Sequence, residues 1–353
     1  GTVINVAAPN VVVNTNSSNS YATGVDGGAT MNFAGNLDST ATGNRTSVSI
    51  GYPGGDPNSK MNVAGNLTTT TDGNGEGIYI LAGNLAVGGN LTATVGNKNR
   101  DVIRAFGNIN VKGSTTVTST FANGMTLGGN NDFGGPVTVK IAGNNKTGIN
   151  FLSTTNSQFK NDVTVNTTGA NSTGIVSAGT VNVAGNLNVA TTGTGASVGV
   201  NVTGGKFTAN NATVSTIGAQ AHGVVTSGAG NSEFTKLTVN TSGQQAFGVY
   251  VNGENTKTTL GSGSAITTTG YGGIGVLVQD GQLDFASGEI KTSGDYARGI
   301  QVVDYTADGM NFTTGANVTT TGTGAEGVLL SGSAGGEDAI QHQATINGNI
   351  SAG

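Results

Sequence analysis

A short unit recurs along the chain and constrains its fold more than any other feature. It consists of an aliphatic residue, a Thr two places later, a Gly, a variable segment, and then Gly followed by Val or Ile, as in Val165–Val176. The second Gly recurs every 24 to 28 residues, at Gly148, Gly174, Gly199, Gly223, Gly248, Gly275, Gly299 and Gly327. Self-similarity at a period of about 20–50 residues is the signature of a solenoid. At roughly 25 residues per coil, the 353 residues would form about 14 coils.

Each coil is expected to hold three short strands separated by turns. Between Gly199 and Gly223 the strands are predicted at Val200–Val202, Lys206–Ala209 and Thr213–Ile217, with one turn at Asn210–Asn211. Gly and Asn suit such turns because they tolerate positive φ. Parallel crossovers are right-handed. The sequence therefore predicts an all-β fold, a right-handed parallel β-helix with three strands per coil, as a single domain over residues 1–353.

Columns of similar residues in successive coils predict which side chains face inward. One aliphatic column comprises Ile78, Ile149, Ile175, Val200, Val224, Val249, Val276, Ile300 and Val328. A second column, rich in Phe, comprises Phe159, Val183, Phe207, Phe234, Leu260, Phe285 and Phe312. A Thr column comprises Thr167, Thr191, Thr216, Thr241, Thr268, Thr292 and Thr320. Alternation places these side chains inward or at the bend, where their hydroxyls are expected to bond turn amides. We therefore do not interpret this column as an ice-binding face. Asn36, Asn66 and Asn186 share one turn position and are expected to stack as a ladder.

Composition excludes several classes of function. The net charge of −5 and pI near 4.9 argue against nucleic acid, which requires a basic patch. The absence of Cys excludes disulfides and a thiolate nucleophile. His222 and His342 are far apart, so no metal site is expected. Two Gly-x-Gly-x-x-Gly matches begin at Gly270 and Gly322, but neither precedes a predicted helix, which a dinucleotide site needs. We assign no catalytic, cofactor-binding or metal residue.

Two sets of residues are candidates for an interaction surface. Apolar residues occupy the outward position between the inward residues of the Gly-Val strand, and exposed apolar patches often mark interaction sites. This column is Tyr79, Val176, Val225, Tyr250, Leu277 and Leu329. Two segments lengthen their coils and are expected to protrude as loops, and they contain Tyr52, Asp56, Asp304, Tyr305 and Asp308.

The sequence combines a coil of about 25 residues, Gly-Val/Ile strands, Thr-rich faces, the lack of Cys, and Ala-Gly-Asn-Leu turns at Ala34–Leu37 and Ala64–Leu67. This pattern resembles the passenger domains of pertactin-like bacterial autotransporters. That resemblance implies secretion through the type V pathway and display at the outer membrane. It also implies a C-terminal membrane barrel beyond Gly353, and we expect further coils there. No functional residue of that family can be transferred to this sequence.

The first functional hypothesis is therefore a non-enzymatic adhesin. It would bind a host surface or matrix protein, a glycan, or another copy of itself through a flat face, and would contribute to virulence or biofilm formation. An alternative is a polysaccharide-degrading β-helix enzyme with paired carboxylates, for which Asp304, Asp308, Glu337 and Asp338 are the candidates. A third hypothesis is a surface-layer or fibre-forming protein.

Overall fold

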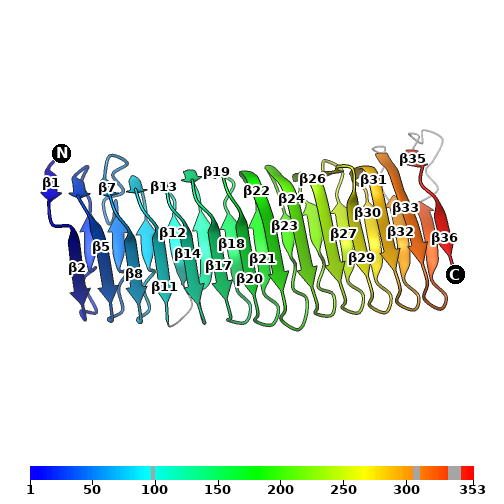
Figure 1. Cartoon of the computed structure of the whole chain (residues 1–353), viewed down its shortest axis with the longest axis horizontal. Coiled ribbons are helices and arrows are strands. Elements are labelled where there is room, and N and C mark those ends of the chain that lie inside the picture. Colours follow the sequence, from blue (N-terminus) through cyan, green and yellow to red (C-terminus); the bar gives the residue numbers. More distant parts are fainter. Residues whose placement is uncertain (97–99, 305–310, 333–342) are drawn as a thin grey trace. The chain divides into compact units, whose positions relative to one another are not determined.

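The chain consists of two compact units of parallel β-coils (Figure 1). The structure, a computed structural model, describes residues 1–96, 100–304, 311–332 and 343–353, and every regular element in these ranges is a β-strand. The first unit comprises Gly1–Thr168 and Thr180–Gly185, and the second comprises Gly169–Gly179 and Asn186–Gly353. The predicted β-solenoid is confirmed. The assignment of residues 1–353 to one domain stays a prediction.

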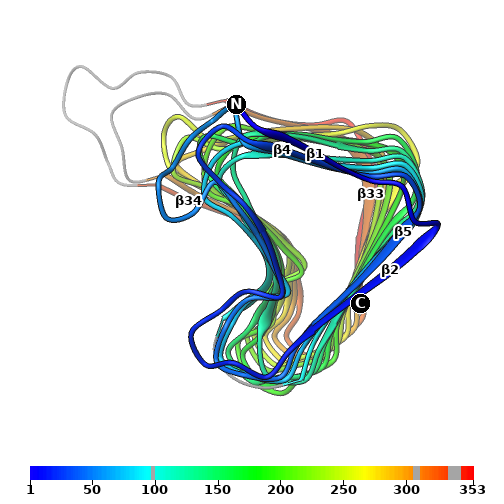
Figure 2. The same ribbon diagram turned by 90° about the vertical axis from the view of Figure 1, so that its left-hand side faces the viewer.

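In the first unit, each coil carries strands on three faces (Figure 2). The first face holds β1 (Val3–Val6), β4 (Thr30–Phe33), β7 (Lys60–Val63), β10 (Asn84–Val87), β13 (Asn108–Val111), β16 (Asn130–Phe133) and β19 (Asn156–Phe159). The second face holds β2 (Asn10–Thr15), β5 (Asn36–Ala41), β8 (Leu67–Thr71), β11 (Leu91–Val95), β14 (Thr115–Ser119), β17 (Val137–Ile141) and β20 (Val163–Thr167). The third face holds β3 (Thr23–Val25), β6 (Val48–Ile50), β9 (Ile78–Ile80), β12 (Asp101–Ala105), β15 (Asn123–Leu127) and β18 (Thr147–Phe151).

In the second unit, the first two faces merge in most coils. Long strands cover both faces, namely β24 (Lys206–Thr216), β26 (Asn231–Thr241), β31 (Gln282–Thr292) and β33 (Asn311–Thr320). β22 (Thr180–Thr191) contains residues of both units. Elsewhere the two faces are separate strands, namely β28 (Lys257–Leu260), β29 (Ser264–Thr268), β35 (Gln343–Ile346) and β36 (Ile350–Ala352). The third face holds β21 (Thr173–Ser177), β23 (Val200–Val202), β25 (Val224–Ser227), β27 (Phe247–Asn252), β30 (Ile274–Gln279), β32 (Arg298–Asp304) and β34 (Glu326–Gly332).

The third face has thirteen strands within the described residues, and β35 and β36 follow the last of them in the chain. The predicted number of about 14 coils thus agrees with the structure to within one coil. Pairing is parallel, with each residue opposite its equivalent about one repeat later, as for Val200 and Val224. The two glycine-rich segments beginning at Gly270 and Gly322 lead into β30 and β34, and both are strands.

Alternation of side chains along each strand creates the core. In β17, for example, Val137, Val139 and Ile141 are buried while the residues between them are not. The Gly of the repeat is required by close packing. A Cβ on Gly199 would lie 2.2 Å from Cγ1 of Val214 and 2.6 Å from the carbonyl oxygen of Gly223. The recurring Gly therefore marks the point where the third face approaches the second most closely.

Two details of the predicted coil are wrong. The turn at Asn210–Asn211 does not interrupt the strand, because β24 runs from Lys206 to Thr216 and pairs with β26 on both sides of its two exposed Asn residues. The Phe column also does not keep one register. Phe234 lies opposite Ala209, and Phe207 lies opposite Ser232. A shift of two residues keeps both rings inward because side chains alternate with a period of two.

The polar columns show a different outcome in each case. The seven Thr side chains are buried as predicted. Thr216 donates to the carbonyl oxygen of Ala221 (2.7 Å), but the hydroxyls of the other six have no partner among the described residues, so the predicted bonding to turn amides is wrong. The Asn ladder is confirmed for Asn36 and Asn66, because Asn36 Oδ1 accepts from the backbone amide of Asn66, and Asn66 Oδ1 accepts from that of Asn90 (both 2.8 Å). Asn186 Oδ1 accepts instead from the side-chain Nδ2 of Asn211 (3.3 Å).

Candidate functional site: an arginine–tyrosine pocket

A polar pocket of about 290 Å³ lies in the first unit, where the turns that follow β5, β8 and β11 meet the outward side of β9 and β12. On the third face, Tyr79 of β9 is paired in register with Arg104 of β12 on one side and with Ser49 of β6 on the other. The pocket is lined by Tyr21, Asn44, Arg45, Thr46, Tyr52, Asn74, Gly75, Glu76, Tyr79, Arg100 and Arg104. It therefore combines the outward column predicted from the repeat with residues of the turns.

The protruding segment between β6 and β7 supplies Tyr52. Gly51 turns the chain with a φ of 69° directly after β6. Asp26 Oδ2 accepts from the amide of Gly54 (3.1 Å), and Asp56 Oδ1 accepts from the amide of Asn58 (2.8 Å). Asp56 lies against Gly28 and is not part of the pocket. The loop is thus pinned at several points, and of its two candidate residues only Tyr52 reaches the pocket.

Four aromatic rings form a row across successive coils. The ring centroids of Tyr21 and Tyr52 are 5.8 Å apart, those of Tyr52 and Tyr79 are 5.6 Å apart, and those of Tyr79 and Phe106 are 6.4 Å apart. All three pairs are edge-to-face, an arrangement that attracts the edge of one ring to the face of the next. The structure therefore brings together Tyr52 and Tyr79, which the sequence assigned to two separate candidate surfaces.

A buried carboxylate anchors the base of the pocket. Glu76 is 3% exposed. Its Oε2 accepts from Thr46 Oγ1 (2.8 Å), and its Oε1 accepts from Arg100 Nη1 (3.1 Å). This hydrogen bond raises the pKa of Arg100. Since each oxygen of Glu76 accepts one of these hydrogen bonds, this carboxylate positions Thr46 and Arg100.

The other two arginines keep most of their donors free. Arg45 donates from Nε to the carbonyl oxygen of Ser18 (3.2 Å), and its guanidinium carbon lies 5.7 Å from the Tyr21 ring centroid. Arg104 Nε lies 3.8 Å from Asp101 Oδ2, is buried, and has no hydrogen-bond partner among the described residues. Its guanidinium carbon lies 5.4 Å from the Phe106 ring centroid. Each guanidinium carries five N–H donors, so both can still bind an anion.

Tyr21 and Tyr79 are neutral hydrogen-bond donors at neutral pH. Burial raises the pKa of Tyr79, and Arg104 partly opposes that rise. Burial, followed by the neighbouring Tyr52, raises the pKa of Tyr21. A protonated phenol donates through its hydroxyl and offers an apolar ring face. The arrangement can thus hold a ligand that has an anionic group, hydroxyls and an apolar face.

The remaining members of the predicted outward column lie in the second unit. Val176, Val225, Tyr250, Leu277 and Leu329 do share one row, interrupted by Asn201 and Gln301. Leu277 is only 7% exposed, because it packs with Ile274 and Val303 against Phe247 and Tyr250. The Tyr250 hydroxyl donates to Gln279 Oε1 (3.0 Å). This row is a partly buried apolar ridge that lacks the charged groups of the first unit.

His222 completes the ridge. It stacks on Phe247 at a centroid distance of 4.4 Å, and its Nδ1 accepts from the amide of Phe247 (3.0 Å). Burial lowers the pKa of His222 to about 4. The imidazole is therefore neutral at pH 7, where it has a packing role.

Several candidates cannot be placed. Tyr305 and Asp308 lie outside the described residues, as do Glu337 and Asp338 of the proposed carboxylate pairs. Asp304 ends β32. Within the described residues, no group of three or more His, Cys, Asp or Glu could hold a metal ion.

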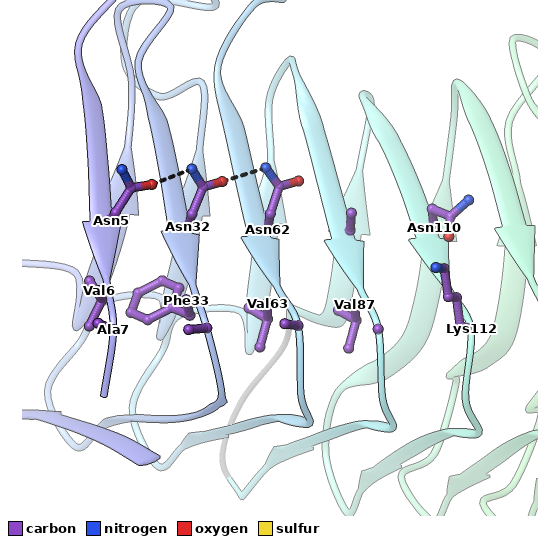
Figure 3. A pocket seen from close by; sticks show the side chains of 14 residues that line it. Asn5, Val6, Ala7, Asn32, Phe33, Asn62, Val63, Val87, Asn110 and Lys112 are labelled. Atoms are coloured by element: carbon purple, nitrogen blue, oxygen red, sulfur yellow. Dashed lines mark hydrogen bonds between the residues drawn. The ribbon is translucent and has the colours of Figure 1, made fainter. Parts of the chain in front are cut away.

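A second depression, of about 500 Å³, lies at the end of the first face in the same unit (Figure 3). Its floor is apolar and includes Val6, Phe33 and Val63. Above it, the amides of Asn5, Asn32 and Asn62 bond one another, at 2.7 Å from Asn32 to Asn5 and 2.8 Å from Asn62 to Asn32. These amides satisfy each other and Lys112 is the sole charged residue of its lining, so we do not take this groove as the site.

Sequence reasoning missed Tyr21, Arg45, Arg100 and Arg104. One signal was present, because the chain contains only four Arg, at positions 45, 100, 104 and 298, and three of them fall within 60 residues. Their convergence depended on the coil register, which brings residues about one repeat apart into contact.

Family models, curated proteins and solved structures give no match to this chain. No helix in the described part of the chain could span a membrane. The fold and the site therefore carry the functional argument.

Proposed function

We propose that this chain is a surface-displayed adhesive domain of a bacterial autotransporter, and that it binds its ligand without turning it over. The observation that carries this proposal is the arginine–tyrosine pocket on the outward side of a parallel β-solenoid. Small-molecule and saccharide sites are concave, with aromatic walls and a few placed polar groups. The 25-residue coil, the low charged content of 9% and the absence of Cys support the autotransporter assignment.

The chemistry of the pocket favours binding over catalysis. Its single carboxylate, Glu76, uses both oxygens to hold Thr46 and Arg100. Hydrolysis of a glycosidic bond usually needs two carboxyl groups that face the scissile bond. Many copies of one weak site on a cell surface would together give firm attachment by avidity.

The test is a bead assay with the intact chain. Beads coated with the protein are scored for capture on a panel of matrix proteins and glycans and for clumping without ligand. We expect capture by a glycan, loss of capture with Tyr52→Ala, and full capture with Tyr271→Ala, which removes a 52% exposed ring in the second unit. Clumping without any ligand would mean that the domain binds other copies of itself and not a host ligand. The proposal fails if beads neither clump nor attach, or if captured glycan is cleaved.

A further inference from the structure

The arginines of this chain are concentrated at one place. Three of the four arginines border the pocket, although the chain as a whole carries a net charge of −5. Glu76 is the single carboxylate in the lining, and Asp101 lies 3.8 Å from Arg104 Nε beside it, so three guanidinium groups and two carboxylates leave the site at +1. A concave site of one sign concentrates ligands of the opposite sign. The ligand of this pocket therefore carries negative charge.

The kind of anion follows from the donors. Arg100 spends one N–H on Glu76, Arg45 spends one on a backbone carbonyl, and Arg104 donates none to the described residues. Guanidinium forks match carboxylates, phosphates and sulfates through paired N–H donors. The guanidinium groups are also held in place, by Glu76 and by the rings of Tyr21 and Phe106. The site is thus prepared for an oxyanion before the ligand arrives.

The rest of the ligand follows from the aromatic row. Its four rings lie 5.6 to 6.4 Å apart in successive coils and offer repeated apolar platforms, and the three tyrosines among them carry hydroxyls at their edges. A pyranose has C–H groups on its faces and hydroxyls on its rim, so it matches a tyrosine in both respects. A peptide of Asp and Glu has no ring to place there. A polynucleotide carries one negatively charged phosphate per base, so a chain that is acidic overall would repel it.

We propose that the pocket binds a carboxylate-bearing sugar of an acidic polysaccharide. The carboxylate contacts Arg104 and Arg100, and the sugar ring lies against Tyr52, with further sugars following the row toward Phe106. This inference rests on the proposed adhesive function and specifies its ligand class. All the binding contacts in this inference come from side chains of the protein itself.

The experiment measures binding of the intact protein to immobilised polygalacturonate and to the same polymer after reduction of its carboxyl groups. We expect binding to the acidic polymer alone, at least a tenfold loss with Arg104→Gln, and a further loss as salt is raised, because ion pairs are screened.

The matched control is Arg298→Gln. Arg298 is the fourth arginine, and it pairs with Glu326 at 2.6 Å in the second unit, away from the pocket. Its replacement should leave binding unchanged. Equal binding of the reduced polymer would overturn the inference, as would equal weakening by Arg298→Gln.

Two other outcomes separate this inference from the proposed function. Preferential binding of dextran sulfate, poly-glutamate or single-stranded DNA over polygalacturonate would refute the carboxylated sugar. Capture of a neutral glycan that is lost with Tyr52→Ala would also refute it, while leaving the adhesive function intact. Absence of binding to every polymer and every matrix protein would remove both.

Discussion

The second unit continues its strands through the corner between the first two faces, whereas the first unit stops at every corner. β24, β26 and β31 each contain 11 residues. In the first unit the corresponding strands are separate and contain four to six residues, as in β4 and β5. The first unit also carries the longer coil with the loop that bears Tyr52. Regular coils thus give an apolar ridge, and the departures from regularity give the charged pocket.

The comparison implies that a ring of the second unit serves stability and a ring of the first serves binding. Phe234 is 1% exposed and packs 6.0 Å from Phe207, while Tyr52 lies on the rim of the pocket at 36% exposure. We expect Phe234→Ala to cost about 3–5 kcal/mol, the range for a large buried aromatic side chain. Tyr52→Ala should cost less, about 1–2 kcal/mol, because its ring is partly exposed and loses its edge-to-face contacts with Tyr21 and Tyr79 together with part of its burial.

Urea unfolding followed by circular dichroism measures both changes, and the bead assay measures binding. Equal loss of stability in the two variants would show that the loop of the first unit is as important to the fold as the core of the second. Retention of capture by the folded Tyr52→Ala protein would contradict the assignment of the site.

Acid should distinguish the two units as well. The pKa of His222 falls to about 4 in the folded protein because the ring is buried. Above the unfolded-state pKa of about 6.5, the free energy of unfolding keeps its full value. As pH falls from there toward the folded-state pKa, the free energy of unfolding decreases, because the unfolded chain binds the proton first. The loss is at most about 3 kcal/mol.

Hydrogen exchange at pH 7 and pH 4.5, expressed as protection factors, locates this effect. We expect protection to fall in the strands around His222 and less in β1 to β20, because the first unit contains no His. His222→Asn keeps an acceptor for the amide of Phe247 and removes the titrating ring, so its protection should depend less on pH. An unchanged pH dependence in this variant would assign the effect to carboxylates.

The repeat predicted the architecture because one constraint acts in successive coils from Gly124 onward. Gly199 and its equivalents must lack a side chain where the third face meets the second, and that requirement recurs in the sequence. The site could be predicted only in part. Tyr79 and Tyr52 were visible as an outward residue and a loop residue, but Arg45, Arg100 and Arg104 each look like an isolated surface charge. Their convergence depends on the register between coils. The same register makes Phe207 and Phe234 differ by two residues from the alignment predicted for the Phe column.

The recurring Gly is required by close packing, whereas some turns of the second unit require a positive φ. Substitution at such a turn gives the smallest effect that we predict. Gln245 adopts a φ of 53°, a conformation that glycine accepts more readily, whereas Gln244 beside it is not in that region. Both side chains are exposed. Gln245→Gly should raise the free energy of unfolding by about 0.5 kcal/mol, and Gln244→Gly should lower it by about 0.5–1 kcal/mol. Paired urea titrations measure the two signs. A loss of stability in both variants would mean that Gln245 contributes contacts that outweigh its backbone strain.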